Sequence, residues 1–568
     1  MSSENIEIFF KKLENAKKSN DDTLSAEILD RIANLYLQNN DATNGLKYFL
    51  ESLEIKNKSN EKNLMEIAKS FYFIGKSFKI LKKPKDSIDN LIKSLDIVRG
   101  LGDEIRAAEI LNNIGLTYRD LDDRENFLSY CLESLDLKKK LFKGNHESIS
   151  NSLENVGLAY KDMTNAKLSL KYLFESLEMK RILSKGKDDP AIVNTLNNIC
   201  SVYKDLGDGK AFLETSLEAF KIGKKIFGSS HIQIALSLNN IGLAYDILGD
   251  HENAIYYSLR SLEMRQRLFV GENNLEIADS LCNVGVVYRS KGDGENSIKY
   301  TRDSLSMCKI IYEDTAHPFI AGLLSNLGND YRILGDLNNT LSNHLESLNM
   351  RRKLFKRDHE DIAASLNNVS IAYSDLDDAN NFLKYSLESL EMRKKIYKPP
   401  NLHIATSLIN TSNAFSCMKD RDNSLNYGLE ALDMFSKLYE TDHIDIAFTL
   451  NNIGNAYRLL GDWERYLEYS IKSLEMKRRI FNGDHLSIAY SLNNVAGAYT
   501  KLGMFSISLE YSIDSFKMIN RVYETHYSSI TIANNISKHY DLFRNFQEKS
   551  FYESFIANMG KELSKFKK

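Results

Sequence analysis

The chain of 568 residues has few residues that break helices or cross-link a chain. Proline occurs only five times. Because proline removes a backbone donor and interrupts helix interiors, its scarcity allows long helical stretches. The five cysteines are scattered and form no CxxC pair, which argues against a disulfide framework or a zinc site and for a reducing compartment.

The sequence also lacks an excess of one charge and any long apolar run. Basic residues number 74 and acidic residues 77, whereas sequence-independent nucleic-acid binding usually needs a clear basic excess. No apolar segment approaches the length of a membrane span. Residues 1–12, with acidic residues before a very short apolar patch, do not resemble a signal peptide. We therefore expect a cytoplasmic protein with no nucleic-acid partner and no membrane insertion.

Motifs of catalysis are missing as well. The sequence contains no nucleotide-binding glycine loop, no HExxH and no GxSxG. Recurring glutamates such as Glu263 and Glu391 belong to SLEMR segments, where they are placed to form helical ion pairs with nearby basic residues. We expect no enzymatic activity, no cofactor and no bound metal.

One short motif recurs throughout the chain. SLNNIGLAYDILGD ends at Asp250, SLNNVSIAYSDLDD at Asp378 and TLNNIGNAYRLLGD at Asp462. Its aromatic residue, called the marker aromatic below, recurs at intervals of 40 to 43 residues. The markers are Tyr36, Phe78, Tyr118, Tyr160, Tyr203, Tyr245, Tyr288, Tyr331, Tyr373, Phe415, Tyr457, Tyr499 and Tyr540. A fixed period of this size indicates a repeat array, here of thirteen units with an atypical last one.

Each unit is predicted to be a pair of helices. Around Tyr245, apolar residues recur at three- and four-residue steps over 234–248, which is the pattern of one helix face. Gly249 is typical of a helix C-terminus, and Asp250 is a good N-cap for the next helix. A second apolar side over 252–269 predicts that next helix. We call the two helices of a unit helix A and helix B.

A small residue lies three positions before the marker in every unit. It is glycine in seven units: Gly75, Gly115, Gly157, Gly242, Gly285, Gly328 and Gly454. Because glycine within a helix costs about 1 kcal/mol relative to alanine, its recurrence predicts that helices A and B approach closely here. One helix-B position is small in some units and aromatic in others, namely Phe127, Phe212, Phe382 and Tyr466. These four units are expected to pack or register differently.

These residues resemble the tetratricopeptide repeat, whose helix A carries an apolar residue, glycine, two variable residues and tyrosine. The common form has about 34 residues. The longer period here, with LNN before that core, is similar to the kinesin-light-chain type of repeat. The resemblance spans about residues 25–545. It implies an all-α, right-handed superhelical solenoid of antiparallel helix pairs, with the helix-A faces on its concave surface.

The resemblance divides the chain into three parts. Residues 1–22 are expected to be a lead-in helix or cap, and residues 23–545 an array of about 12–13 repeats. Residues 546–568 are expected to form a capping helix that covers the last repeat, since the ends of solenoids need a polar outer face. Its apolar residues are Phe551, Phe555, Ile556 and Leu563.

Asparagine recurs five positions before the marker, on helix A. The set, called the asparagine ladder below, is Asn113, Asn155, Asn198, Asn240, Asn283, Asn326, Asn368, Asn410, Asn452 and Asn494, followed by Asn535. An amide offers two donors and an acceptor, which match the NH and CO groups of an extended peptide. In peptide-binding proteins of the family, an asparagine at this position often holds the ligand main chain. Alternatively, each asparagine bonds the neighbouring repeat and sets the stacking, and both roles could apply to different rungs.

Basic residues recur one position after the marker. The set, called the basic stripe below, is Lys79, Arg119, Lys161, Lys204, Arg289 and Arg332. It would attract an acidic peptide in a salt-sensitive way. Alternatively, these residues favour the helix dipole and pair with the neighbouring Asp120, Asp162 and Asp205. Later units carry Ser374, Ser416, Arg458 and Thr500, so the groove is expected to be basic first and neutral later.

Histidine recurs in the loops between helix B and the next helix A. These residues are His146, His231, His317, His359, His403, His443, His485 and His526. Packed helices lie about 8–10 Å apart, so histidines of successive repeats are too distant to share one metal ion. Loop closure or helix capping is the expected role.

The sequence therefore predicts a protein–protein interaction scaffold that binds a linear peptide or a protein partner in its concave groove. Two alternatives remain open. One is a structural subunit of a larger assembly that uses its convex face or edges, and the other is a regulatory subunit of an enzyme. Fold alone does not decide among them.

Overall fold

The computed structural model describes residues 2–59, 63–522, 532–534, 536–538 and 546–565. Among these residues it is helical, with no strand, which confirms the all-α class. The chain divides into two compact units, one of Met1–Glu272 with Asp279–Lys291 and the other of Asn273–Ala278 with Gly292–Lys568. We describe each unit by itself. Asn535, Tyr540 and His526 lie outside the described residues.

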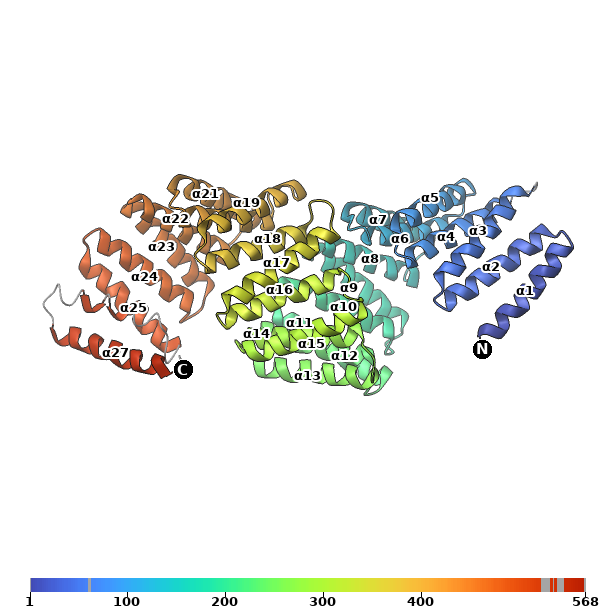
Figure 1. Cartoon of the computed structure of the whole chain (residues 1–568). Coiled ribbons are helices and arrows are strands. Elements are labelled where there is room, and N and C mark those ends of the chain that lie inside the picture. The colour runs from blue at the N-terminus through green and yellow to red at the C-terminus, as the bar shows by residue number, and fades with distance from the viewer. Residues whose placement is uncertain (1, 60–62, 523–531, 535, 539–545, 566–568) are drawn as a thin grey trace. The chain divides into compact units, whose positions relative to one another are not determined.

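Within each unit, antiparallel helices follow one another as A–B pairs (Figure 1). The helices of the first unit are α1 (Ser2–Lys18), α2 (Asp22–Gln38), α3 (Ala42–Lys58), α4 (Leu64–Ile80), α5 (Pro84–Gly100), α6 (Glu104–Arg119), α7 (Arg124–Leu141), α8 (Glu147–Asp162), α9 (Ala166–Leu183), α10 (Pro190–Leu206), α11 (Gly209–Phe227), α12 (Ile232–Ile247) and α13 (His251–Leu268). Helix α14 (Leu275–Ser290) supplies residues to both units.

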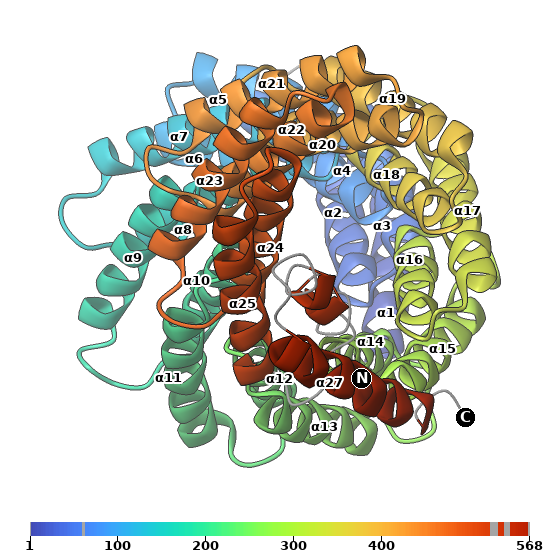
Figure 2. The ribbon, with the colours of Figure 1, turned by 90° about the vertical axis from the view of Figure 1, so that its left-hand side faces the viewer.

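The second unit continues the same alternation of A and B helices. Its helices are α15 (Gly294–Ile311), α16 (Pro318–Ile333), α17 (Leu337–Leu354), α18 (Glu360–Asp375), α19 (Ala379–Ile396), α20 (Leu402–Cys417), α21 (Arg421–Leu438), α22 (Ile444–Leu460), α23 (Trp463–Ile480), α24 (Leu486–Lys501), α25 (Phe505–Val522) and α27 (Phe546–Lys565). Figure 2 shows α22 to α25 stacked side by side, with α27 next to α25.

The turn between helices A and B follows the sequence signals. Gly249 has a φ of 80°, a left-handed conformation that glycine adopts without strain. Asp250 caps α13 because its carboxylate accepts a hydrogen bond from the backbone NH of Asn253 at 3.2 Å. The amide of Asn253 in turn donates to the same carboxylate at 2.7 Å. The short turn therefore fixes the antiparallel course of each pair.

The loop between helix B and the next helix A is closed by histidine. His146 accepts a hydrogen bond from the backbone NH of Ser148 through Nδ1 and so caps α8. Its ring stacks on Phe142, with 3.9 Å between the ring centroids. The same combination of cap and stack occurs at His231, His317, His359, His443 and His485. The predicted capping role is confirmed at these positions.

The recurring glycines lie where helix B presses on helix A. A Cβ added to Gly157 would lie 2.7 Å from Leu173, and one added to Gly242 would lie 2.4 Å from the hydroxyl of Ser258. The marker aromatics stabilise the same interface from its edge. Tyr160 stacks on Tyr172 of α9, with 5.5 Å between the ring centroids. The predicted close approach is thus confirmed, although Gly454 has no neighbour nearer than 3.5 Å.

The four large helix-B aromatics do not change the register. Helix B begins six residues after the marker in the units of Phe127 and Phe382, as it does in the unit of Ala254. Phe127, Phe212, Phe382 and Tyr466 are all at most 5% exposed. The expected difference in register is therefore wrong, because the aromatic rings are accommodated within the core.

Buried polar side chains fasten helices within and between repeats. Ser134 of α7 donates a hydrogen bond to the backbone carbonyl of Ala108 in α6 at 2.7 Å. Lys138, one turn further along α7, reaches the next repeat and donates to the hydroxyl of Ser152 in α8 at 2.8 Å. Each such bond contributes about 1 kcal/mol and would leave a buried polar group unsatisfied if broken. Equivalent pairs recur in both units.

Helix α27 packs on the end of the second unit. Tyr552 is 6% exposed, and its ring lies 5.3 Å from that of Phe516 in α25. The ring of Phe555 lies 4.8 Å from Phe516. Phe551, by contrast, is 59% exposed. Tyr552, and not the predicted Phe551, therefore packs against α25. The side chain of Leu563 lies outside the described part of the chain.

One unit has a histidine in the A–B interface. His344 of α17 is 3% exposed and fills the space opposite Gly328, where a Cβ would lie 2.6 Å from the imidazole ring. Burial, together with the positive charges of Arg332 and Arg351, lowers the pKa of His344 to about 4, and the Asp375 carboxylate raises it slightly. The equivalent position holds serine in several other units, including Ser258 and Ser386.

We predict that His344 makes the second unit sensitive to acid. Between pH 6.5 and 4 the unfolded chain protonates this histidine and the folded chain does not, so stability falls as the pH falls, by about 3 kcal/mol at most. The thermal midpoint of H344S should therefore decline less than that of the wild type over this range. Comparing the two slopes removes two effects that are not due to His344 titration. These are the stability that both proteins lose as their carboxylates are protonated, and the constant cost of the cavity that H344S leaves. Parallel slopes would contradict the assignment.

Candidate peptide-binding surface

The ladder asparagines lie on the A helices, which contact one another from repeat to repeat. Helix α6 touches α8, α8 touches α10, and α18 touches α20. Each asparagine therefore stands beside the A helix of the preceding repeat. Its neighbour there is the residue six positions before the preceding marker, a position that varies in the sequence.

Most rungs of the ladder bond that neighbour. Asn155 Nδ2 donates to Asn112 Oδ1 at 2.7 Å, and Asn494 Nδ2 donates to Asn451 Oδ1 at 2.6 Å. The other pairs of this kind are Asn113 with Tyr72, Asn198 with Glu154, Asn240 with Asn197, Asn368 with Ser325 and Asn410 with Asn367. The ladder is thus a set of links between repeats, as the alternative interpretation of the sequence proposed.

Two rungs differ from this arrangement. Asn283 donates to Asp279 of its own helix at 3.3 Å. Asn452 makes no hydrogen bond to any side chain within the described residues, because the apolar Ile409 occupies the position of its neighbour. The side chain of Asn452 on α22 is half-buried.

The basic stripe is largely neutralised by ion pairs across the contact between the A helices of successive repeats, called a joint below. Arg119 Nε lies 2.7 Å from Asp162, Lys79 lies 3.5 Å from Asp120, and Lys161 lies 3.4 Å from Asp205. Arg332 pairs with Asp375, and this hydrogen bond raises the pKa of Arg332. In every case the aspartate is two residues after the marker of the next repeat, not the sequence neighbour.

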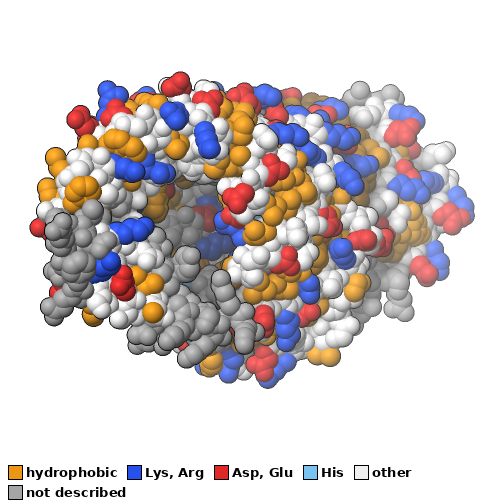
Figure 3. Space-filling view, turned by 60° about the vertical axis from the view of Figure 1, so that its left-hand side comes forward, with side chains coloured by type: hydrophobic (Ala, Val, Ile, Leu, Met, Phe, Trp, Pro, Cys, Tyr) orange, Lys and Arg blue, Asp and Glu red, His pale blue; other side chains and the backbone are white. Residues whose placement is uncertain are grey.

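Two members of the stripe lie outside these ion pairs. Lys204 is exposed and has no ion-pair partner among the described residues, since Ile247 occupies the aspartate position of the next repeat. Arg289 makes a contact of its own. The stripe therefore does not form a continuous basic surface, and on the face shown in Figure 3 basic and acidic side chains are interspersed.

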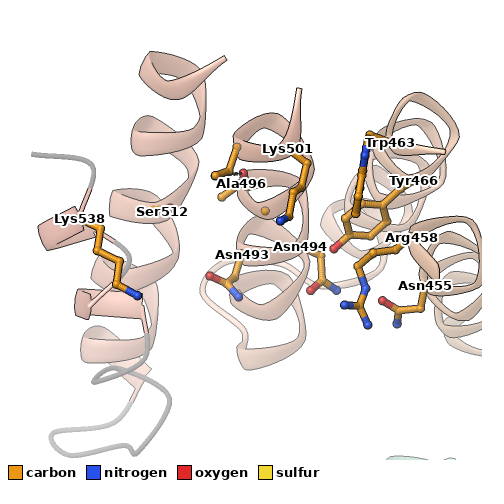
Figure 4. Close-up of a pocket in the computed structure, with 12 residues that line it drawn as sticks. Asn455, Arg458, Trp463, Tyr466, Asn493, Asn494, Ala496, Lys501, Ser512 and Lys538 are labelled. Atoms are coloured by element: carbon orange, nitrogen blue, oxygen red, sulfur yellow. Dashed lines mark hydrogen bonds between the residues drawn. The ribbon is translucent and has the colours of Figure 1, made fainter. Parts of the chain in front are cut away.

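A cavity of about 570 Å³ opens on the helix-A side of the second unit. Its lining includes Arg458 of α22, Trp463 and Tyr466 of α23, and Asn494 and Lys501 of α24 (Figure 4). Arg458 was expected to lie in the neutral part of the groove, and Trp463 was not among the predicted site residues. The position of Lys501 holds aspartate in the repeats of Asp120, Asp162, Asp205 and Asp375 and varies in the others, so the sequence carried no clear signal for this cavity.

No group of three or more His, Cys, Asp or Glu side chains in the described part of the chain could hold a metal ion. No described helix combines the length and the apolar character needed to cross a membrane.

Paired helices in a regular register, linked through their A faces, define an all-α repeat protein of the helix-pair class. Models of the tetratricopeptide repeat match residues 26–59, 107–148, 191–267, 319–395, 403–477 and 445–518. Together these segments cover more than half of the chain. The chain belongs to the tetratricopeptide repeat family.

The chain is also similar to solved structures. BtubC (BKLC) from P. vanneervenii is 17% identical, with a TM-score of 0.37 over 41% of this chain and 94% of that one. The nearly identical TPR-like repeats of a Podosopora anserina protein described as a kinesin light chain are 13% identical, with a TM-score of 0.33 over 37% and 99% of the two chains. No curated protein matches the sequence.

We predict that the rungs differ in their effect on stability. N494A removes the donor to Asn451 and should cost about 1 kcal/mol relative to N452A, whose side chain has no such bond. Both substitutions share the same gain in helix propensity. Because repeat arrays need not unfold in one step, hydrogen exchange in α22 and α24 should accompany the urea titration. Equal losses in the two variants would show that the ladder bonds do not stabilise the stacking.

Proposed function

We propose that this chain is a scaffold that holds a linear peptide along the A faces of its repeats. Tetratricopeptide repeats generally serve as protein–protein interaction scaffolds. The proposal goes further by assigning the binding to the asparagine ladder and its neighbours. It is a binding function, without a catalytic step.

The observation that carries the proposal is the incomplete use of the ladder amides. In the pair of Asn112 and Asn155, one NH of Asn155 bonds the carbonyl of Asn112. The NH₂ group of Asn112 and the carbonyl of Asn155 then have no side-chain or backbone partner among the described residues. An extended peptide offers a carbonyl and an NH group that match these two. The same ladder can thus link the repeats and present donors and acceptors at regular intervals.

We predict that peptides selected from a random linear display library on the full chain will depend on these amides. The variant N452A/N455A removes two half-buried amides of α22 that make no side-chain hydrogen bond within the described residues. It should fold like the wild type and raise the Kd of peptides that dock on α22 by about ten- to thirtyfold, since each lost hydrogen bond contributes about 1 kcal/mol.

The matched control is N380A, which removes an exposed asparagine from α19, a B helix of the second compact unit. It should leave the Kd unchanged. Hydrogen exchange with and without peptide should show protection on A helices. Peptides that protect B helices instead, and bind N452A/N455A as tightly as the wild type, would favour the structural-subunit alternative, which uses the convex face or edges.

A further inference from the structure

A largely buried cation recurs on helix B, twenty positions after the marker. In each case its side chain donates a hydrogen bond to a serine or threonine on the A helix of the next repeat. The pairs are Lys56 with Ser70, Lys138 with Ser152, Lys180 with Thr195, Arg265 with Ser280, Arg351 with Ser365, Arg393 with Ser407 and Lys477 with Ser491. The hydrocarbon chain of the cation therefore fills space between one helix B and the A helices on either side of it.

The repeat formed by α4 and α5 lacks this pair. Val98 holds the position of the cation, and Ile110 holds the position of its hydroxyl partner. A cavity of about 230 Å³ opens here, lined by both side chains together with Met65, Ala68 and Phe73. Because protein interiors are otherwise close-packed, the missing side chain leaves a space with an apolar interior.

The cavity coincides with the place that the cation occupies in other repeats. Its lining also includes Tyr72, Arg106 and Glu109, whose positions elsewhere supply acidic partners of the cation. These partners are Asp30 and Glu154 at the position of Tyr72, Glu66 at that of Arg106, and Asp279 at that of Glu109. Of these three positions in the cavity, only that of Glu109 remains acidic.

The cavity thus retains a carboxylate without its cation. Glu109 accepts a hydrogen bond from the hydroxyl of Tyr72 at 2.7 Å and forms no salt bridge among the described residues. Burial and this carboxylate raise the pKa of Tyr72, so its hydroxyl remains a donor. The basic residues of the lining, Lys69 and Arg106, each pair with an acidic residue three positions earlier. The lining therefore combines an apolar interior with one negative charge that no salt bridge neutralises.

We infer that this cavity, the Val98 pocket, binds a small free aliphatic amine. The apolar interior would surround the hydrocarbon chain, and the ammonium group would lie beside Glu109. The ligand would supply, as a separate molecule, the group that other repeats carry on helix B. It would contact α4, α5 and α6 at once, so its binding would stabilise their packing. The inference does not depend on the proposed peptide binding.

The probe is n-hexylamine, added to the full chain with ¹³C-methyl-labelled methionine. Met65 lines the pocket, so its methyl resonance, assigned with M65L, should shift saturably as the amine binds. Hexanol and hexanoate have the same chain length and a different head group, and they should bind about tenfold or more weakly. This preference should shrink in E109Q, which removes the charge of the carboxylate and keeps a side chain of similar size.

The decisive variant is V98K/I110S, which restores the pair that Lys138 and Ser152 form in another repeat. Its own lysine should occupy the pocket, so hexylamine should no longer shift the Met65 methyl, and folding should be unchanged or improved. The matched control is D96N, which adds the same charge on the exposed side of α5. It should bind hexylamine like the wild type.

Equal binding of hexylamine by V98K/I110S and the wild type would overturn the inference. Equal affinity of the wild type for hexanol and hexylamine would also do so, because the pocket would then be selective for apolar chains alone. Tighter binding of N-acetyl-lysine methylamide than of hexylamine would assign the pocket to a lysine of a partner protein and not to a free amine. If V98K/I110S did not fold, E109Q would decide, since it removes only the charge.

Discussion

Every helix pair in this chain has an apolar side that only the next pair can cover. Leu91 and Leu95 of α5 are buried against Ile110 and Leu111 of α6, so the core of one repeat is completed by the following one. The spacing between repeats is set by this burial together with the small residue near each marker. All polar groups on the A helices must fit that spacing.

The joints and any ligand therefore compete for the same polar side chains. Where the neighbouring repeat supplies a partner, as for Asn494 with Asn451 or Arg119 with Asp162, the side chain holds the repeats together. Where it does not, the side chain keeps its hydrogen-bonding capacity or charge for another molecule. Asn452 opposite Ile409 is one such position. The proposed binding function therefore relies on positions where the repeat pattern fails.

Much of the architecture could be predicted from one sequence. Some features are local, such as the turn at Gly249 and Asp250 and the helix caps formed by histidines such as His146. Others, such as the period and the close approach at Gly157, recur often enough to be recognised in the sequence. The candidate site was predicted less well. The ladder was placed on the correct helices, but the pairing of the basic stripe with the next repeat was not foreseen.

The sequence by itself determined the helices, their pairing and the positions that recur on each A helix, because short-range periodicity and turn chemistry act within about forty residues. Only the tertiary structure decided which residues meet across a joint. Adjacent A helices pack with an offset, so Arg119 pairs with Asp162 of the next repeat and not with its own neighbour Asp120. Such a meeting depends on how two A helices pack, and no spacing within a single repeat contains that information.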